Sequence, residues 1–401
     1  MTATTHTKPL NLTLPEALDR VAQLRPQIAA GATAGESDRK MPAQLHRALE
    51  DAGLFALLVP RHYGGAEMHP LDVYRVWEAV ARIDPTAGWL LVMNGSLSAM
   101  AAWLPEAGAD ELFGAGPTTT AGALHPPGVI VRVDGGWRLT GQVPFTSGCD
   151  HARWFILPGM EMDGDGPKLD PTTGQPTPYV CFVHRDDATV IDTWHTMGMR
   201  GTGSADVAVQ DVFVPDHRCY PVAPLVTPNP GFDGPVARMF PLLTVMGEAI
   251  ISVGAAATAV DILIGLAQRK TPAYTMVALR DRELAQYQAG RARGLVDASR
   301  ATLFDACAVA YGEASQGKAL SPDTKIRCQV AASFAAEACA EAGRMVHAAA
   351  GSSGIRNELG LERLFRDLHT LTQHGSKSAP RYGSAGRLMF GLENDWIFLA
   401  F

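Results

Sequence analysis

Apolar and polar residues follow a helical pattern at the start of the chain. From Leu12 to about Gly116, apolar residues such as Leu45 and Leu49 recur at spacings of three or four, which is typical of amphipathic helices. The segment Pro60–Gly65 interrupts this pattern with a proline and two glycines, so it predicts a loop. We therefore expect the N-terminal region to be entirely helical.

Short runs of β type replace this pattern from Thr118 onward. Val129–Val133 and Trp137–Val143 flank Asp134-Gly135-Gly136, which is a strong hairpin signal. Further runs rich in β-branched and aromatic residues follow at Trp154–Leu157, Tyr179–Val183 and Val207–Val214. We expect the middle third of the chain to form an antiparallel sheet.

The chain becomes helical again, and rich in alanine, after the Pro- and Gly-rich segment Pro224–Gly234. Met276–Tyr311 contains no proline, and as one helix it would be about 50 Å long at about 1.5 Å per residue. Later helices are expected from Pro322 to near Gly351, over Leu361–Gln373 and over Ala385–Leu399. Consecutive long helices need partners, which favours a helical bundle.

Composition and charge narrow the range of functions. Hydrophobic residues make up 47% of the chain and charged residues 19%, which is typical of a folded globular protein. The formal net charge is -7 and no block of like charges occurs, so we expect neither nucleic-acid nor anionic-membrane binding. The N-terminus lacks the basic and apolar regions of a secretory signal, which predicts a cytoplasmic protein.

The most apolar stretch, Leu242–Leu266, contains two charged residues, Glu248 and Asp261. They leave no charge-free run of the roughly 18 residues that a membrane span needs. We interpret this stretch as a buried helix.

Several familiar catalytic motifs do not fit. The glycine cluster Gly198–Ser204 runs into a strand instead of opening a helix, so it is not a dinucleotide-binding fingerprint. His369 and His374 would lie about 140° apart around a helix, which disfavours a shared metal ion. No H-E-x-x-H, G-x-S-x-G or Walker sequence occurs. We expect no metal, and hydrolase or nucleotide-triphosphatase chemistry has no support.

Two segments carry residues suited to a ligand. In Phe145–Trp154, hydroxyl residues and a glycine lie beside aromatics at a strand end, where a ring can stack on a planar ligand and a hydroxyl can bond a ring nitrogen. An ordinary strand end and turn is the alternative. Arg366–His374 is either part of a site or a polar helix face, with His374 interacting with the helix dipole.

The domain order and the motifs together resemble the acyl-CoA dehydrogenase superfamily over nearly the whole chain. The motifs are Tyr63-Gly-Gly, Phe145-Thr-Ser-Gly, Gly198-Met-Arg-Gly-Thr-Gly-Ser-Ala-Asp-Val, Asp211-Val-Phe-Val-Pro215 and Phe365-Arg-Asp-Leu-His369. More narrowly, Ser147–Trp154, Gly201–Ser204 and Arg366–His374 resemble its flavin-dependent monooxygenase branch. The resemblance implies an α+β fold with an N-terminal helical domain (1–117), a middle antiparallel β-domain (118–228) and a C-terminal four-helix bundle (229–401).

The stretch after Arg366-Asp367 bears on the reaction. Acyl-CoA dehydrogenases abstract an α-proton with a carboxylate, commonly a few residues after an Arg-Asp pair, whereas here no acid follows until Glu393. His374 occupies this neighbourhood, and an imidazole can assist proton transfer to and from a flavin hydroperoxide. His369 is a second catalytic candidate, although its place on another part of the helix surface favours a structural role.

The resemblance thus implies the oxygenase component of a two-component monooxygenase. It would use O2 and reduced flavin (FMN or FAD), through a C4a-hydroperoxyflavin, to oxygenate a small organic substrate that is aromatic or polycyclic. The chain has no pyridine-nucleotide motif, so a separate reductase would supply the reduced flavin. The alternatives are an acyl-CoA dehydrogenase with FAD and a displaced base, and a flavin-fold scaffold without turnover.

The resemblance also implies contacts to the flavin ring. Phe145 falls where the family stacks an aromatic on the isoalloxazine, and Thr146 is its neighbour. Ser147 falls where a hydroxyl reaches the flavin N5, which makes it a catalytic candidate as well. Gly122 begins the loop that wraps the flavin.

Other cofactor contacts are implied near subunit boundaries. Arg269 matches an arginine that reaches the flavin phosphates from another subunit, although Pro272 replaces the phenylalanine expected three residues later. Gly351-Ser-Ser-Gly354 matches a turn that completes the neighbouring subunit's flavin site. A homo-oligomer, and specifically a tetramer, is therefore expected.

The substrate side is less defined by the resemblance. Phenol hydroxylases of this branch carry a histidine before the β-domain and a serine in the flavin loop, and neither is evident in 93–98 or 121–124. Trp89 and Leu97 would form an apolar wall or, alternatively, part of the core. Asn94 and His125 complete the substrate candidates.

Overall fold

The computed structural model describes residues 9–125, 127–164, 166–171, 174–222, 228–232 and 234–400. The chain forms two compact units. Unit 1 comprises Met1–His69, Leu90–His195 and Arg200–Ala237. Unit 2 comprises Pro70–Trp89, Thr196–Met199 and Arg238–Phe401. The division into three segments at residues 117 and 228 stays a prediction.

Unit 1 starts with two helices, α1 (Leu14–Asp38) and α2 (Ala43–Asp51). The backbone N–H of Thr13 donates to the Glu16 carboxylate at 2.8 Å, which caps the start of α1. Near its other end, α1 packs on the short turn Arg200–Thr202. Further helices of this unit are the part of α4 (Pro85–Leu97) from Leu90 onward and α5 (Glu106–Phe113).

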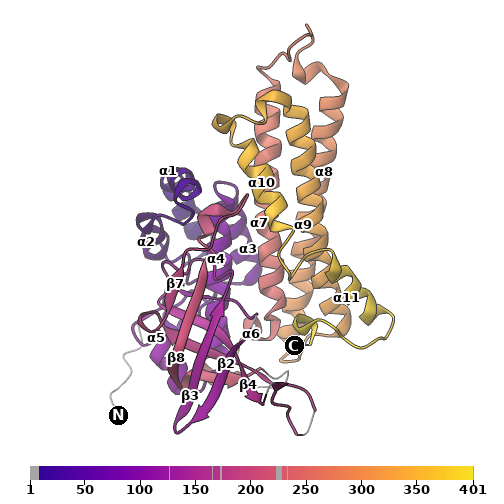
Figure 1. Cartoon of the computed structure of the whole chain (residues 1–401). Helices are drawn as coiled ribbons and strands as arrows, with labels where there is room; N and C mark the ends of the chain where they lie inside the picture. Colours follow the sequence, from indigo (N-terminus) through magenta and orange to yellow (C-terminus); the bar gives the residue numbers. More distant parts are fainter. Residues whose placement is uncertain are drawn as a thin grey trace. The chain divides into compact units, whose positions relative to one another are not determined.

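A sheet of nine strands dominates the described part of unit 1 (Figure 1). Its strands lie in the order β7-β8-β3-β2-β4-β6-β9, and β1 and β5 also pair with β4. They are β1 (Thr120–Gly122), β2 (Gly128–Val133), β3 (Gly136–Val143), β4 (Trp154–Asp163), β5 (Gly166–Pro167), β6 (Pro178–His184), β7 (Thr189–Ile191), β8 (Asp206–Pro215) and β9 (Cys219–Pro221).

The sheet is mixed, which corrects the expectation of an antiparallel one. Most pairs, such as β2–β3 and β3–β8, are antiparallel, but β2–β4 and β1–β4 are parallel. The connection 144–153 lets β4 run beside β2 in the same direction. The run of β-branched residues Val129–Val133 identifies the strand but not its buried face, because Ile130 is buried between Val129 and Val131, which are also apolar and yet exposed. It does not encode the direction of pairing.

Long helices make up unit 2. The three longest, α7 (Leu242–Ala267), α8 (Glu283–Ala314) and α9 (Pro322–Ala350), pack along one another, as Figure 1 shows. Three shorter helices pack against them: α3 (Pro70–Ala81), α10 (Leu361–Leu371) and α11 (Pro380–Met389). Among the described residues, α7 is the one helix long and apolar enough to cross a membrane, and 72% of its most apolar window is buried, as in a core helix.

Three helix boundaries differ from the predicted ones. The helix predicted from Met276 begins only at Glu283, because the Leu279 N–H donates to the Lys270 carbonyl at 2.8 Å and turns the chain first. α10 ends at Leu371, so His374 lies in the turn beyond the helix. The helix predicted over Ala385–Leu399 is instead α11, which ends at Met389.

Candidate active site

The loop after β3 presents an exposed aromatic ring in unit 1. Phe145 has a left-handed backbone, with φ of 59°, and 65% of the residue is exposed. A bulky residue rarely adopts this conformation unless neighbouring contacts impose it. Here the N–H groups of Thr146 and Gly148 donate to the carbonyls of Ala205 and Thr202, at 3.1 and 2.9 Å. These bonds tie the loop to the glycine cluster.

Buried hydroxyl groups also join this loop to the glycine cluster. Ser147 Oγ is 2.8 Å from Ser204 Oγ, which is 2.7 Å from Thr202 Oγ1. All three residues are buried. Ser147 was predicted as a site residue, whereas its two partners were not, although both belong to the motif Gly201-Thr-Gly-Ser204. The Thr146 hydroxyl, in contrast, donates to the Val143 carbonyl at 3.2 Å and is fully buried.

Four other candidates in unit 1 have distinct environments. The Asn94 amide donates to the carbonyls of Thr120 and Ser147, at 2.7 and 3.1 Å, so this buried side chain positions the loop. Gly122 packs so closely on Ile156 of β4 that no Cβ would fit. Leu97 is buried, and His125 is exposed before β2.

In unit 2, His374 is surrounded by charged and polar partners. Its Nδ1 lies 2.7 Å from Ser376 Oγ and 3.0 Å from Glu248 Oε2. The Trp89 ring meets the imidazole edge-on, with ring centroids 5.1 Å apart. The side chain of His374 is 37% exposed, whereas that of Glu248 is 2% exposed.

Glu248 is the acceptor for this cluster. Ser376 Oγ donates to its Oε2, and Lys377 Nζ, which is fully buried, lies 3.2 Å from the same oxygen. Burial alone would raise the pKa of Glu248, but His374, Lys377 and Ser376 together lower that pKa to about 2. Burial lowers the pKa of Lys377, and Glu248 partly offsets this. The carboxylate is therefore ionised at neutral pH.

Three residues of this cluster, Glu248, Ser376 and Lys377, were not predicted from the sequence as site residues. Glu248 was noted only as a charge inside an apolar stretch. A carboxylate in a buried helix needs a partner, and this was the available signal.

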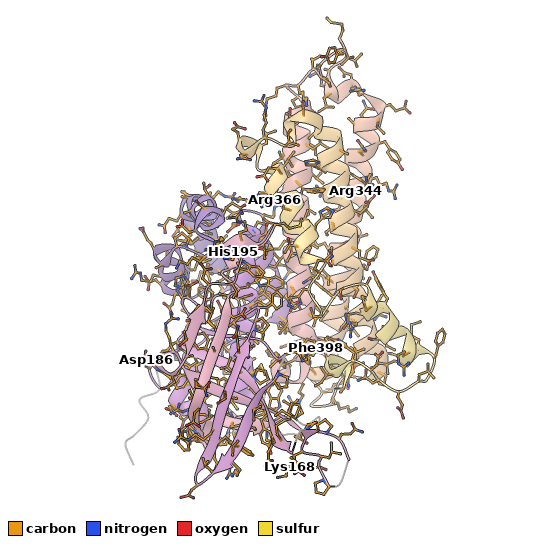
Figure 2. All side chains as sticks on the ribbon, viewed as in Figure 1. Lys168, Asp186, His195, Arg344, Arg366 and Phe398 are labelled. Atoms are coloured by element: carbon orange, nitrogen blue, oxygen red, sulfur yellow. The ribbon has the colours of Figure 1, made fainter. Side chains whose placement is uncertain are left out.

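The Arg-Asp pair of α10 anchors part of the glycine cluster within unit 2. The Met199 N–H donates to Asp367 Oδ1 at 2.5 Å, and Arg366 Nη1 donates to the Met197 carbonyl at 2.5 Å. Arg366 is labelled in Figure 2. A Cβ on Gly198 would lie 2.5 Å from the Arg366 carbonyl oxygen, which explains the glycine there.

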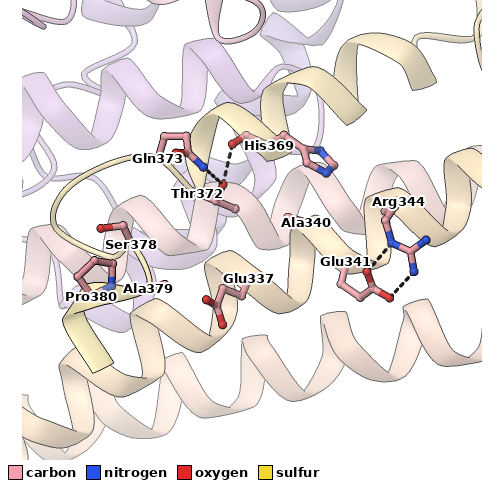
Figure 3. Close-up of a pocket in the computed structure, with 10 residues that line it drawn as sticks. All are labelled: Glu337, Ala340, Glu341, Arg344, His369, Thr372, Gln373, Ser378, Ala379 and Pro380. Carbon is pink, nitrogen blue, oxygen red and sulfur yellow. Dashed lines mark hydrogen bonds and ion pairs between the residues drawn. The ribbon is translucent and has the colours of Figure 1, made fainter. Parts of the chain in front are cut away.

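His369 lies in a different environment from His374. Its Nδ1 bonds the Phe365 carbonyl at 2.7 Å, one helical turn earlier. It lines a surface pocket of about 370 Å³ between α9, α10 and the loop before α11 (Figure 3). Glu337, Glu341 and Arg344 of α9 line the same pocket.

The remaining cofactor candidates lie at the C-terminal ends of α7 and α9. Lys270, next to Arg269, donates to the Ala350 carbonyl at 2.6 Å, directly before Gly351. Gly351 has a φ of 56°, which favours glycine, and Gly354 closes the turn through a 2.8 Å bond to its carbonyl. Arg269 is exposed. The structure thus brings Lys270 to the glycine turn within one chain, whereas the Arg269 guanidinium donates to the Gly265 carbonyl at 3.1 Å.

Comparisons with known proteins identify the family of this chain. The models of the acyl-CoA dehydrogenase N-terminal and C-terminal domains match residues 19–112 and 246–378. The pigment production hydroxylase of a Rhodococcus species is 32% identical over 91% of this chain and 93% of its own. The indole-3-acetate monooxygenase of Pseudomonas putida is 30% identical over 89% of this chain and 90% of its own.

Solved structures extend the likeness to the whole fold. The 3-HSA hydroxylase from Rhodococcus sp. RHA1 has a TM-score of 0.87 and 25% identity, covering 96% of this chain and 98% of that one. XiaF from a Streptomyces species, solved with FADH2 and glycerol, has a TM-score of 0.85 and 26% identity, covering 96% and 97%. The chain belongs to the acyl-CoA dehydrogenase superfamily, in its branch of flavin-dependent monooxygenases, which are oxidoreductases. The family and the broad fold predicted from the sequence are confirmed.

Proposed function

We propose that this protein is the oxygenase component of a two-component flavin-dependent monooxygenase. One oxygen atom of O2 enters a small aromatic or polycyclic substrate and the other leaves as water, while reduced flavin supplies two electrons. A separate reductase supplies the reduced flavin. The family membership and the names of the relatives support this assignment.

The residues of unit 1 fit a flavin. A flat ring with polar edges needs an aromatic surface and hydrogen-bonding groups beside it. Phe145 is exposed while the hydroxyls next to it are buried and bonded, so an aromatic surface and polar groups lie in one loop. We propose that Phe145 stacks on the ring, that Ser147 bonds its N5 edge, and that Arg269 binds the flavin phosphate. When bound, the flavin supplies the redox chemistry with O2.

In unit 2, His374 is the proposed proton carrier. Its Nδ1 is engaged by Ser376 and Glu248, so Nε2 is the nitrogen that can exchange a proton with a ligand. Trp89 packs against the same ring and is the proposed apolar contact for the substrate. His369, bonded to a backbone carbonyl, is assigned a structural role.

One observation favours the oxygenase over an acyl-CoA dehydrogenase with a displaced base. The carboxylate beside His374 is Glu248, whose pKa is lowered to about 2. Its side chain is only 2% exposed and its Oε2 already contacts Ser376 and Lys377, so neither its basicity nor its accessibility suits the abstraction of an α-proton. We therefore assign Glu248 no proton abstraction.

We further propose a cytoplasmic homotetramer built on the C-terminal helices, with these helices forming the four-helix bundle of the family. The support is the length of α7, α8 and α9 and their mutual packing. The basic residues Arg269 and Lys270 would then serve a flavin held with a neighbouring subunit. Sedimentation measured with and without flavin tests this assembly.

The test of the function uses the whole protein with chemically reduced FMN or FAD. The complex is mixed with O2 and a panel of phenols, indoles and polycyclic compounds, and the oxygenated product per O2 consumed is measured. Product formation without a reductase in the mixture is the expected result. Bleaching of oxidised flavin by an acyl-CoA thioester would establish the dehydrogenase instead, and failure to bind either flavin state would favour a scaffold.

A further inference from the structure

We propose that Glu248 is a positioning residue that holds His374 in the tautomer with the proton on Nδ1, so that Nε2 faces the reacting groups. The effect of this arrangement on catalysis rests on the proposed oxygenase function. The arrangement itself is a property of the protein without flavin.

The protons of the cluster can be assigned from its geometry. An ionised carboxylate can only accept hydrogen bonds. Ser376 Oγ donates its single proton to Glu248 Oε2. His374 Nδ1 lies 2.7 Å from Ser376 Oγ and 3.0 Å from Glu248 Oε2, and either contact then needs a proton on Nδ1. The backbone N–H of Ser376 also approaches Nδ1, at 3.5 Å, which is the longest of these contacts. We therefore place the proton of the neutral ring on Nδ1, which leaves Nε2 to accept a proton or donate one.

The imidazole is also fixed in orientation. The backbone of Ser376 is fixed, because the Gln329 side-chain amide donates to the Ser376 carbonyl at 2.8 Å. The N–H groups of Lys377 and Ser378 donate to the His374 carbonyl at 3.2 and 3.0 Å, which closes the turn. Trp89 packs on the ring at 5.1 Å. A rotation that exchanged the two ring nitrogens would break the contact with Glu248.

Lys377 supplies the charge that this arrangement requires. A buried carboxylate without a counter-charge is strongly destabilising. Lys377 Nζ lies 3.2 Å from Glu248 Oε2 and 4.7 Å from the centre of the Trp89 ring, where a cation is also stabilised. The ion pair therefore keeps Glu248 ionised as an acceptor for His374.

The test measures the tautomer directly, by nitrogen NMR of the flavin-free full chain labelled with 15N-histidine. His374→Asn identifies the signal of this residue. The conservative variant is Glu248→Gln, and the double variant Glu248→Met with Lys377→Met removes both buried charges, so that it folds without an unpaired one. Glu78→Gln is the matched control, because Glu78 is another largely buried carboxylate of unit 2, paired with Arg300 at 2.8 Å.

We expect the wild type and Glu78→Gln to show the proton on Nδ1, and the double variant to lose this preference. Oxygen transfer by the double variant should fall about 10- to 100-fold, while its affinity for reduced flavin changes little. A folded double variant that keeps both the wild-type tautomer and the wild-type oxygen transfer overturns the proposal. A wild type that binds reduced flavin but oxygenates nothing counts against the proposed function alone, because the tautomer is read without flavin.

Discussion

The two candidate clusters bury polar groups in different ways. In unit 1, Ser147, Ser204 and Thr202 are neutral hydroxyls that bond one another. In unit 2, Glu248 and Lys377 are buried ions, and His374 Nδ1 lies 3.0 Å from the carboxylate. Loss of a neutral hydroxyl removes about one hydrogen bond, whereas loss of one ion leaves the other uncompensated. The stability of unit 2 should therefore depend far more on its cluster than the stability of unit 1 does.

The two clusters also differ in which parts of the chain contribute their side chains. The hydroxyls of unit 1 lie on two loops that are tied by backbone hydrogen bonds. The ions of unit 2 come from α7 and from the turn after α10, far apart in the sequence, and only side chains join them. The stability of unit 2 should thus depend more strongly on which side chain stands opposite Glu248.

The largest effect is expected for His374→Ala. It should lower the rate of oxygen transfer roughly 10²- to 10⁴-fold, the usual contribution of a general acid or base, with little change in affinity for reduced flavin. Single-turnover product formation measures this. His369→Ala is the matched control, because the hydrogen bond of the His369 ring is to the backbone carbonyl of Phe365. A larger loss in the control would move the catalytic role to the α9–α10 pocket.

Lys377→Met should be the most destabilising single change. It leaves Glu248 buried without its counter-charge, which costs about 3–5 kcal/mol of the free energy of unfolding. Urea denaturation of the single variant and of the double variant with Glu248→Met measures the effect. Most of the loss should be recovered in the double variant. If both variants are equally unstable, packing rather than charge holds this cluster together.

The free energy of unfolding at acidic pH should depend on the same ion pair between Glu248 and Lys377. The folded pKa of Glu248, about 2, lies below its ordinary 4.5, so the ionised form favours folding. This contribution is fully present above pH 4.5 and is lost as the pH falls towards 2. The double Met variant should therefore show a flatter stability curve over this range, by a few kcal/mol. Parallel stability curves for the wild type and the double variant would contradict a lowered pKa of Glu248 in the folded protein.

The smallest effect on stability is expected in unit 1. Ser147→Ala should cost about 0.5–1.5 kcal/mol, the net value of a hydrogen bond. If Ser147 also meets the flavin, this variant should release more hydrogen peroxide per O2 consumed than Ser204→Ala, which removes its partner only. Equal coupling of O2 to product in wild type and Ser147→Ala would leave the hydroxyl with a structural role.

Particular residues show how far sequence reasoning reached. The β-rich run around Ile130 and the apolar content of Leu242–Leu266 predicted a strand and a buried helix, because both signals lie in the local sequence. The motif Phe145-Thr-Ser-Gly predicted a ligand-binding loop, and this loop carries an exposed ring and a buried hydroxyl. The parallel pairing of β2 with β4 and the early end of α10 were not predicted, because both depend on contacts between distant segments.

The sequence by itself determined the order of helical and sheet segments, the family and His374 as the residue in place of an acid. Local patterns and motif spacing carry this information. Only the tertiary structure decided that His374 contacts Glu248, and that Lys377 is buried beside the same carboxylate. A charge in an apolar helix signals that a partner exists, but the fold brings that partner from a distant turn, because an ion excluded from water is stable only where an opposite charge meets it.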